Sequence, residues 1–140
     1  MGFKLGSEKR QVRNAQNTPI IKKNLEHGIL GEANSDGSIY IDKSVDLNSA
    51  MGKKVVAHEM QHIKDMESGK AAYGDDWVRW KGKTYKRENG KIWMNGKAHE
   101  EGWEGFPWEK SAIRAEKRAL RQKRRREKKA LRQKRRHEKN

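Results

Sequence analysis

Two histidines and a glutamate near the middle of the chain have a spacing that suits metal chemistry. His58, Glu59 and His62 form the pattern His-Glu-x-x-His. On an α-helix, a step of four residues leaves two side chains only about 40° apart, so both imidazoles can reach one metal ion. Zinc is the metal for which this pattern is typical. Glu59 would stand beside the ion, where its carboxylate can take a proton from zinc-bound water and deliver it to a leaving amine.

A helix over residues 53–67 is predicted to carry this motif. Val56, Met60 and Ile63 recur at i, i+4 and i+7 and would form an apolar face for packing. Gly69 is a typical residue to follow the end of such a helix. Ligands on one face and apolar residues on another are what a buried active-site helix requires. The alternative is an amphipathic helix with two histidines on its surface.

Short strands and turns are predicted on both sides of the motif helix. Residues 29–33 and 38–42 flank an Asn-Ser-Asp-Gly turn and predict a β-hairpin. Residues 20–28, with Gly28 as a stop, predict a short helix before it. Residues 77–102 contain repeated Lys-Gly and Asn-Gly turns and predict a β-meander. A second helix is expected to start after Pro107 and to continue to the last residue, which makes the fold class α+β.

The composition allows one domain with appendages. The chain has 140 residues, of which 32% are hydrophobic and 38% charged, so its core must be small. We expect a polar N-terminal arm over residues 1–18, a folded domain over residues 19–116 and a basic helical tail over residues 117–140. There is no cysteine, which excludes disulfides and thiolate ligands and fits a reducing compartment. No stretch has the length of a bilayer span, and the N-terminus lacks the apolar run of a signal peptide. A cytoplasmic protein, not secreted by a signal peptide, is therefore expected.

Several segments together resemble the small zincin-like metallopeptidases that tailed bacteriophages and prophages encode. These segments are residues 31–39, 55–65, 80–82 and 106–112, and the resemblance spans residues from about 20 to 116. His-Glu-x-x-His is its one highly specific element. The resemblance implies zinc and a minimal zincin-like core: a β-hairpin, the motif helix, a short β-meander and a second ligand helix, here followed by the long basic helix. It also implies that the strand at residues 38–42 lies beside the cleft and binds an extended peptide by strand addition.

A catalytic zinc site of this kind needs a third protein ligand. In gluzincin-like enzymes it is a glutamate on a later helix, often with a small residue three positions on, and Glu109 with Ala112 matches that pattern. The alternative for Glu109 is a favourable position in the first turn of a helix. Asp65 and His99 are competing ligands. Asp65, seven residues after His58, is better placed to orient a ligand histidine, and a solvated carboxylate explains it equally well.

The formal charge of +15 is concentrated in the C-terminal part of the chain. Residues 110–140 hold 16 Lys or Arg and 3 Glu, a net charge of +13, whereas residues 1–109 hold 18 basic and 16 acidic residues, a net charge of +2. Residues 119–129 and 130–140 form a direct repeat with nine of eleven positions identical. Eleven residues are about three helical turns, so the Ala-Leu pair of each repeat falls on nearly the same face.

The tail predicts non-specific binding of DNA or RNA, since its cations would neutralise phosphates. The alternatives are a phage structural protein with an acidic surface, or simple solvation. Two functions follow for the whole chain. A zinc metallopeptidase in the cytoplasm of a bacterial host would cleave a peptide or protein substrate. A non-catalytic virion or packaged protein would instead keep a structural or vestigial zinc site and attach through its basic tail.

Overall fold

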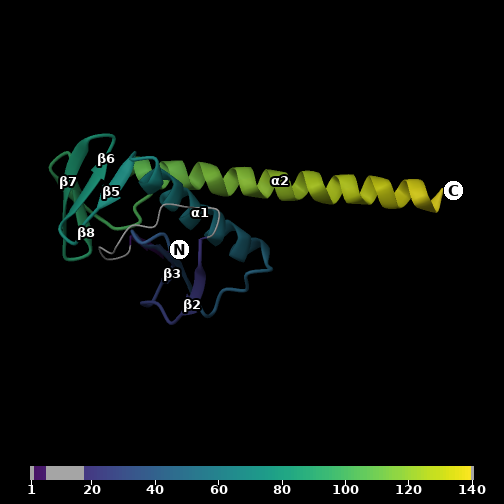
Figure 1. Ribbon diagram of the computed structural model, residues 1–140, viewed down its shortest axis with the longest axis horizontal. Coiled ribbons are helices and arrows are strands. Elements are labelled where there is room, and N and C mark those ends of the chain that lie inside the picture. The colour runs from purple at the N-terminus through teal and green to yellow at the C-terminus, as the bar shows by residue number, and fades with distance from the viewer. Residues whose placement is uncertain (1, 6–17, 140) are drawn as a thin grey trace.

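The computed structural model describes residues 2–5 and 18–139 and has an α+β fold with two sheets and two helices (Figure 1). The first sheet has the strand order β1-β3-β4-β2 and the second has the order β5-β6-β7-β8-β9. The helices are α1 (Ala50–Glu67) and α2 (Pro107–Glu138). The strands are β1 (Gly2–Leu5), β2 (Ile20–Lys23), β3 (Ile29–Ala33), β4 (Ile39–Asp42), β5 (Ala71–Tyr73), β6 (Trp77–Trp80), β7 (Lys83–Glu88), β8 (Lys91–Met94) and β9 (Lys97–Glu100).

The predicted hairpin is confirmed as β3 and β4, which pair antiparallel. Its turn is closed by Asp36, whose carboxylate accepts hydrogen bonds from the backbone and side chain of Ser38 at 2.9 and 2.6 Å. The peptide-binding role implied for β4 is wrong, because β4 pairs with β3 on one side and with β2 on the other. It therefore has no free edge for strand addition.

Two N-terminal expectations differ from the structure. The helix predicted over residues 20–28 is wrong, because residues 20–23 form β2 and pair parallel with β4. The isoleucines of this segment suit a strand, and the neighbouring strand supplies hydrogen bonds that a short helix over residues 20–28 would leave unmade at its ends. Part of the expected arm is also a strand, since residues 2–5 form β1 and pair parallel with β3. Residues 6–17 of that arm lie outside the described residues.

Helix α1 begins three residues earlier than predicted. The hydroxyl of Ser49 caps it by accepting a hydrogen bond from the backbone N–H of Gly52 at 2.9 Å. Val55 and Ile63 are buried against Ala33, Ile39 and Ile41 of the first sheet, while the predicted face residues Val56 and Met60 are only partly buried. One face of α1 thus packs on the first sheet, and α2 packs against another.

The predicted β-meander is confirmed as the second sheet, in which all neighbouring strands are antiparallel. Its tight turns fall at Lys81-Gly82, Asn89-Gly90 and Asn95-Gly96, where both residues of each pair have positive φ. This backbone conformation is the one that Asn-Gly turns favour. A second core cluster lies between this sheet and the start of α2, formed by Leu5, Tyr73, Val78, Ile92, Phe106 and Trp108.

Helix α2 has an inner part and a projecting part. Trp108, Glu109, Ala112 and Glu116 are buried in its first turns, whereas every residue of the range 124–139 is exposed. Figure 1 shows the C-terminal part of α2 extending beyond the rest of the molecule. Within the described residues, neither helix is long and apolar enough to cross a membrane.

Candidate metal centre

The three predicted zinc ligands lie together where α1 crosses α2. One donor atom from each of His58, His62 and Glu109 falls within 4.8 Å of the others. The two carboxylate oxygens of Glu109 lie 3.1 Å from His58 Nε2 and 2.8 Å from His62 Nε2. All three residues are buried. A His-His-Glu group that could hold a metal ion is therefore present, contributed by two helices that are far apart in the sequence.

Local structure explains why these side chains meet. The four-residue spacing on α1 brings the rings of His58 and His62 to a centroid separation of 4.9 Å. Glu109 stands in the first turn of α2, two residues after Pro107, which fixes where the helix begins. Ala112 is completely buried, as expected for a small residue that lets one helix approach another. The predicted pairing of Glu109 with Ala112 thus corresponds to a close helix crossing.

Glu116 belongs to the same cluster and was not identified from the sequence. Its Oε1 lies 2.7 Å from Nδ1 of His58, and the carboxylate is buried. A carboxylate on one ring nitrogen of a histidine fixes the tautomer and leaves the other nitrogen for a metal. Glu116 follows Glu109 by seven residues, which returns to within about 20° of the same helix face. The seven-residue spacing from Glu109 is therefore the feature of the sequence that could have identified Glu116.

Neither of the two competing ligands, Asp65 and His99, belongs to the metal-binding group. Asp65 is buried, but its carboxylate accepts hydrogen bonds from Gln61 and from Ser111, both at 2.9 Å. It therefore ties α1 to α2, and the prediction that it orients a ligand histidine is wrong. His99 is stacked on Trp103 in the second sheet, with ring centroids 3.7 Å apart. Among the described residues, the metal-binding group contains neither of them.

The electrostatics of the cluster favour positive charge at the histidines. Burial alone would lower the pKa of His58, but the carboxylates of Glu109 and Glu116 outweigh it and raise that pKa. Burial likewise opposes the charged form of His62, and Glu109 raises its pKa in the same way. Burial would raise the pKa of Glu109, yet His62 and His58 lower it to about 2. A site that stabilises cationic imidazoles in this way would also stabilise a bound cation.

Glu59 is enclosed between α1 and the first sheet. Its side chain is completely buried, and neither carboxylate oxygen has a hydrogen-bond partner among the described residues. Strand β3 passes so close at Gly31 that a Cβ there would lie 2.9 Å from Glu59 Cγ. Burial raises the pKa of Glu59 to about 8, although His62 acts in the opposite direction. Such a buried carboxyl without a partner is rare in folded proteins and calls for a functional explanation.

A cavity of about 400 Å³ reaches the cluster from one side. His58, Glu109 and Glu116 line its inner end, and Gly102 and Glu104 of the loop before α2 line its rim. Glu59 does not line it. The cavity therefore gives access to two of the three candidate ligands and not to the candidate base.

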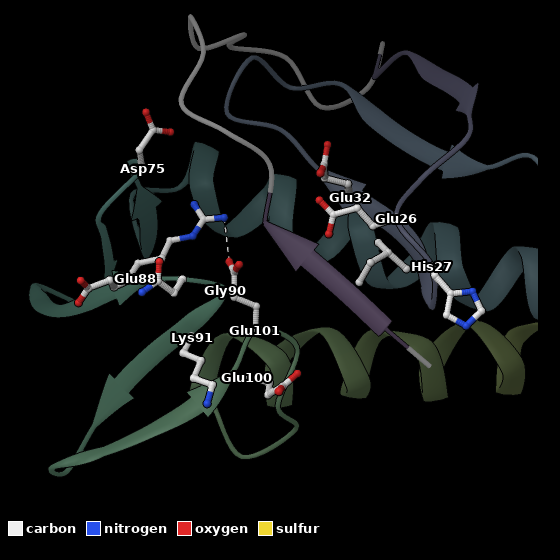
Figure 2. A pocket seen from close by; sticks show the side chains of 12 residues that line it. Glu26, His27, Glu32, Asp75, Glu88, Gly90, Lys91, Glu100 and Glu101 are labelled. Atoms are coloured by element: carbon white, nitrogen blue, oxygen red, sulfur yellow. Dashed lines mark ion pairs between the residues drawn. The ribbon is translucent and has the colours of Figure 1, made fainter.

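A larger cavity, of about 640 Å³, has none of the candidate ligands in its lining. Figure 2 shows the residues that line it. Acidic residues from both sheets and their loops line it: Glu26, Glu32, Asp75, Glu88, Glu100 and Glu101. Arg87 crosses its wall, pairing with Glu101 at 2.8 Å and donating to the carbonyl oxygens of Gly74 and Leu5 at 3.0 and 2.8 Å. Arg87 thereby connects the second sheet to β1, which is a structural role.

No family model matches the chain, and no curated protein or solved structure matches it either. The zincin-like resemblance of the sequence stays a prediction. Any functional inference therefore depends on the geometry of the site itself.

Proposed function

We propose that this chain is a zinc-dependent metallopeptidase, with His58, His62 and Glu109 as zinc ligands and Glu59 as general base. The observation that carries the proposal is the convergence of the three donor side chains next to Glu59 on α1. Two imidazoles and one carboxylate are a donor set found in catalytic zinc sites, where a fourth position stays open for water or substrate. The resemblance of the sequence to phage-encoded zincins supports the same activity, in a bacterial cytoplasm or in a virion.

The residues present fit a zinc ion. Nε2 of His62 is buried and, despite its 2.8 Å ion-pair distance to Glu109, has no aligned hydrogen bond among the described residues. The contact with Glu116 leaves Nε2 of His58 facing the same point. A bound zinc ion would supply Lewis acidity and would lower the pKa of a water molecule to about 7.

The protein side chains would supply the remaining chemistry. Glu59 is held on the same helix as two ligands, and the charge of a bound zinc ion would lower its pKa from about 8. Its carboxylate would then accept a proton from water and donate it to the leaving amine of a cleaved peptide bond. The 400 Å³ cavity beside His58 and Glu109 would admit the peptide carbonyl. Glu116 would keep the ring of His58 in one orientation throughout.

The test compares the wild type with Glu59→Gln in zinc content and in cleavage of a mixed peptide library. Zinc should remain stoichiometric in both proteins, and cleavage by Glu59→Gln should fall by roughly 10²- to 10⁴-fold. Glu67→Gln, an exposed position at the end of the same helix, is the matched control and should cleave like the wild type. A wild-type protein without stoichiometric zinc would disprove the proposal.

A second candidate function is a non-catalytic protein with a structural zinc site. The observation that favours it is the enclosure of Glu59, which is completely buried and does not line the 400 Å³ cavity beside the ligands. In that case the zinc would stabilise the crossing of α1 and α2, and a chelator would unfold the protein. Bound zinc together with cleavage that is equal in the wild type and Glu59→Gln would select this alternative.

A further inference from the structure

The charges of α2 are sorted onto two faces along its whole length. With about 100° between successive residues, Glu109, Ala112 and Glu116 fall within a sector of about 60°, which is the sector buried against α1. Thirteen exposed lysines and arginines fall on the opposite side, within about 140° of the helix circumference. We call these thirteen residues the outer face of α2: Lys110, Arg114, Lys117, Arg118, Arg121, Arg124, Arg125, Lys128, Lys129, Arg132, Arg135, Arg136 and Lys139.

The side of α2 that continues the buried sector beyond Glu116 has a different composition. It carries the Ala-Leu pairs of the repeat and alternating charges, of which Lys123 and Glu127 form an ion pair at 4.0 Å. Lys134 and Glu138 occupy the same two positions of the second repeat. We call this side the inner face of α2. All three glutamates that follow Glu109 lie on the inner side, so no acidic side chain interrupts the outer face.

The eleven-residue repeat preserves this arrangement. Eleven residues advance the helix by only about 20° beyond three full turns. Five of the seven lysines and arginines of the first repeat therefore lie nearly in line with a lysine or arginine of the second. From Lys110 to Lys139 the outer face is about 45 Å long, at 1.5 Å per residue. Neighbouring positive charges on the same helix face repel each other. A long, regular array of negative charge is the partner that would relieve this repulsion.

We propose that the outer face of α2 binds double-stranded DNA through its phosphates, without reading base sequence. The DNA duplex carries about one negative charge per 1.7 Å of axis with both strands counted, so a 45 Å length of duplex carries about 26 phosphates, of which the nearer ones would face α2. The major groove of B-DNA, about 12 Å wide, admits an α-helix. This inference goes beyond the proposed peptidase activity and does not depend on it.

The residue types of α2 and the geometry of nucleic-acid grooves favour duplex DNA over a single strand, double-stranded RNA or a membrane surface. Single strands are bound by stacking bases on aromatic side chains, and the sequence from Glu109 to Lys139 contains no Phe, Trp or Tyr. Double-stranded RNA has a deep, narrow major groove that does not accept a helix. A membrane surface would need a broad apolar face, whereas the projecting part of the inner face offers only Leu131 as a large apolar side chain.

The outer face also extends the site expected from the sequence. Lys110 and Arg114 precede the expected start of the basic tail at residue 117, and both are exposed. They lie on the turns of α2 that carry Glu109 and Glu116, on the side away from the candidate metal ligands. DNA bound along the outer face would therefore run beside the folded domain and past the cavity at the metal centre, which Lys117 of the outer face also lines.

Fluorescence anisotropy of the full-length protein with a 20-base-pair duplex, measured between 50 and 300 mM salt, tests the proposal. The outer pair Arg125→Gln/Arg136→Gln removes two charges at equivalent repeat positions, and the inner pair Lys123→Gln/Lys134→Gln removes two charges at other equivalent positions. The outer pair should lower the slope of log affinity against log salt by about 1.8, and the inner pair should leave it near the wild-type value. Lys110→Gln/Arg114→Gln should resemble the outer pair.

Circular dichroism and zinc content verify that each variant is folded. Equal losses for the outer and inner pairs would overturn the assignment to one face. A wild-type slope in Lys110→Gln/Arg114→Gln would overturn the extension onto the folded domain. Tighter binding of a 20-nucleotide single strand than of the duplex would overturn duplex DNA as the partner in favour of a single strand. No duplex binding at about 150 mM salt would overturn it in favour of an acidic protein surface. None of these readouts requires peptidase activity.

Discussion

The two sides of α2 carry charges of opposite sign near the start of the helix. The negative charges there on the inner side are buried, and the positive charges on the outer side are exposed to water. The carboxylates of Glu109 and Glu116 are buried, and each contacts a nitrogen of His58. The thirteen cations of the outer face are exposed to water. A buried charge is costly without a partner, so each buried carboxylate fixes the position of the group it contacts. A solvated charge needs no partner and acts through the electrostatic potential that it adds to the surface. The role of the inner side can be argued from single residues and their contacts, whereas the role of the outer face depends on the combined charge of its thirteen cations.

The largest effect is expected from removing the candidate ligand on the inner side. Removing a residue that hydrogen-bonds a metal ligand typically lowers metal affinity by roughly 10- to 100-fold. Glu109→Ala removes a ligand itself, so its zinc affinity should fall by more than that. Glu138→Ala, also on the inner side of α2 but exposed, is the matched control and should bind zinc like the wild type. Competition with a chromophoric chelator measures both affinities. Stoichiometric zinc of unchanged affinity in Glu109→Ala would show that the metal is held elsewhere.

Glu116→Gln should produce the next largest effect. The change removes the carboxylate that contacts Nδ1 of His58 and should lower zinc affinity by about 10- to 100-fold, because the ring loses its orientation and part of its basicity. Glu127→Gln makes the same chemical change on the exposed part of the inner face, and its zinc affinity should not move. An unaltered affinity in Glu116→Gln would assign Glu116 to helix packing alone.

The sequence predicted the parts of the fold that depend on local pattern. The motif helix, the hairpin and the meander were recognised from capping residues, apolar spacing and Asn-Gly turns, all of which act within a few residues. Residues 20–23 were assigned to a helix because their pairing with β4 is a contact across some twenty residues. The two outer strands of the first sheet depend on such distant contacts, which no local pattern reports.

The candidate site shows the same division. His58 and His62 follow from helix geometry, and Glu109 followed from resemblance, but Glu116 required knowing which face of α2 turns toward α1. The enclosure of Glu59 was equally hidden, since it depends on β3 passing over α1 at Gly31. Asp65 was placed on the correct helix face and given the wrong partner, because Ser111 reaches it from α2. Long-range packing therefore decides the hydrogen-bond partners of the ligands.

A smaller effect on stability is expected where α1 and α2 are tied together away from the metal. Ser111→Ala leaves one oxygen of the buried Asp65 without its hydrogen bond and should cost about 1–3 kcal/mol of unfolding free energy. Gln133→Ala on the exposed part of α2 should change it by less than about 0.5 kcal/mol. Urea denaturation of the zinc-loaded proteins measures both. Equal stability of the two variants would mean that the helix crossing does not depend on this bond.

The smallest effect is expected from the ion pair of Lys123 and Glu127 on the inner face. Glu127 is largely exposed, and an exposed pair four residues apart on a helix contributes only about 0.3–0.5 kcal/mol. Glu127→Gln should therefore reduce the helicity of α2 slightly at low salt and not at all at 1 M salt, where charges are screened beyond about 3 Å. Circular dichroism at both salt concentrations measures the change. A large loss of helicity that persists at 1 M salt would show that the inner face is packed against another surface. The exposed part of the inner face would then be buried as well, and the two faces of α2 would differ by burial along the whole helix.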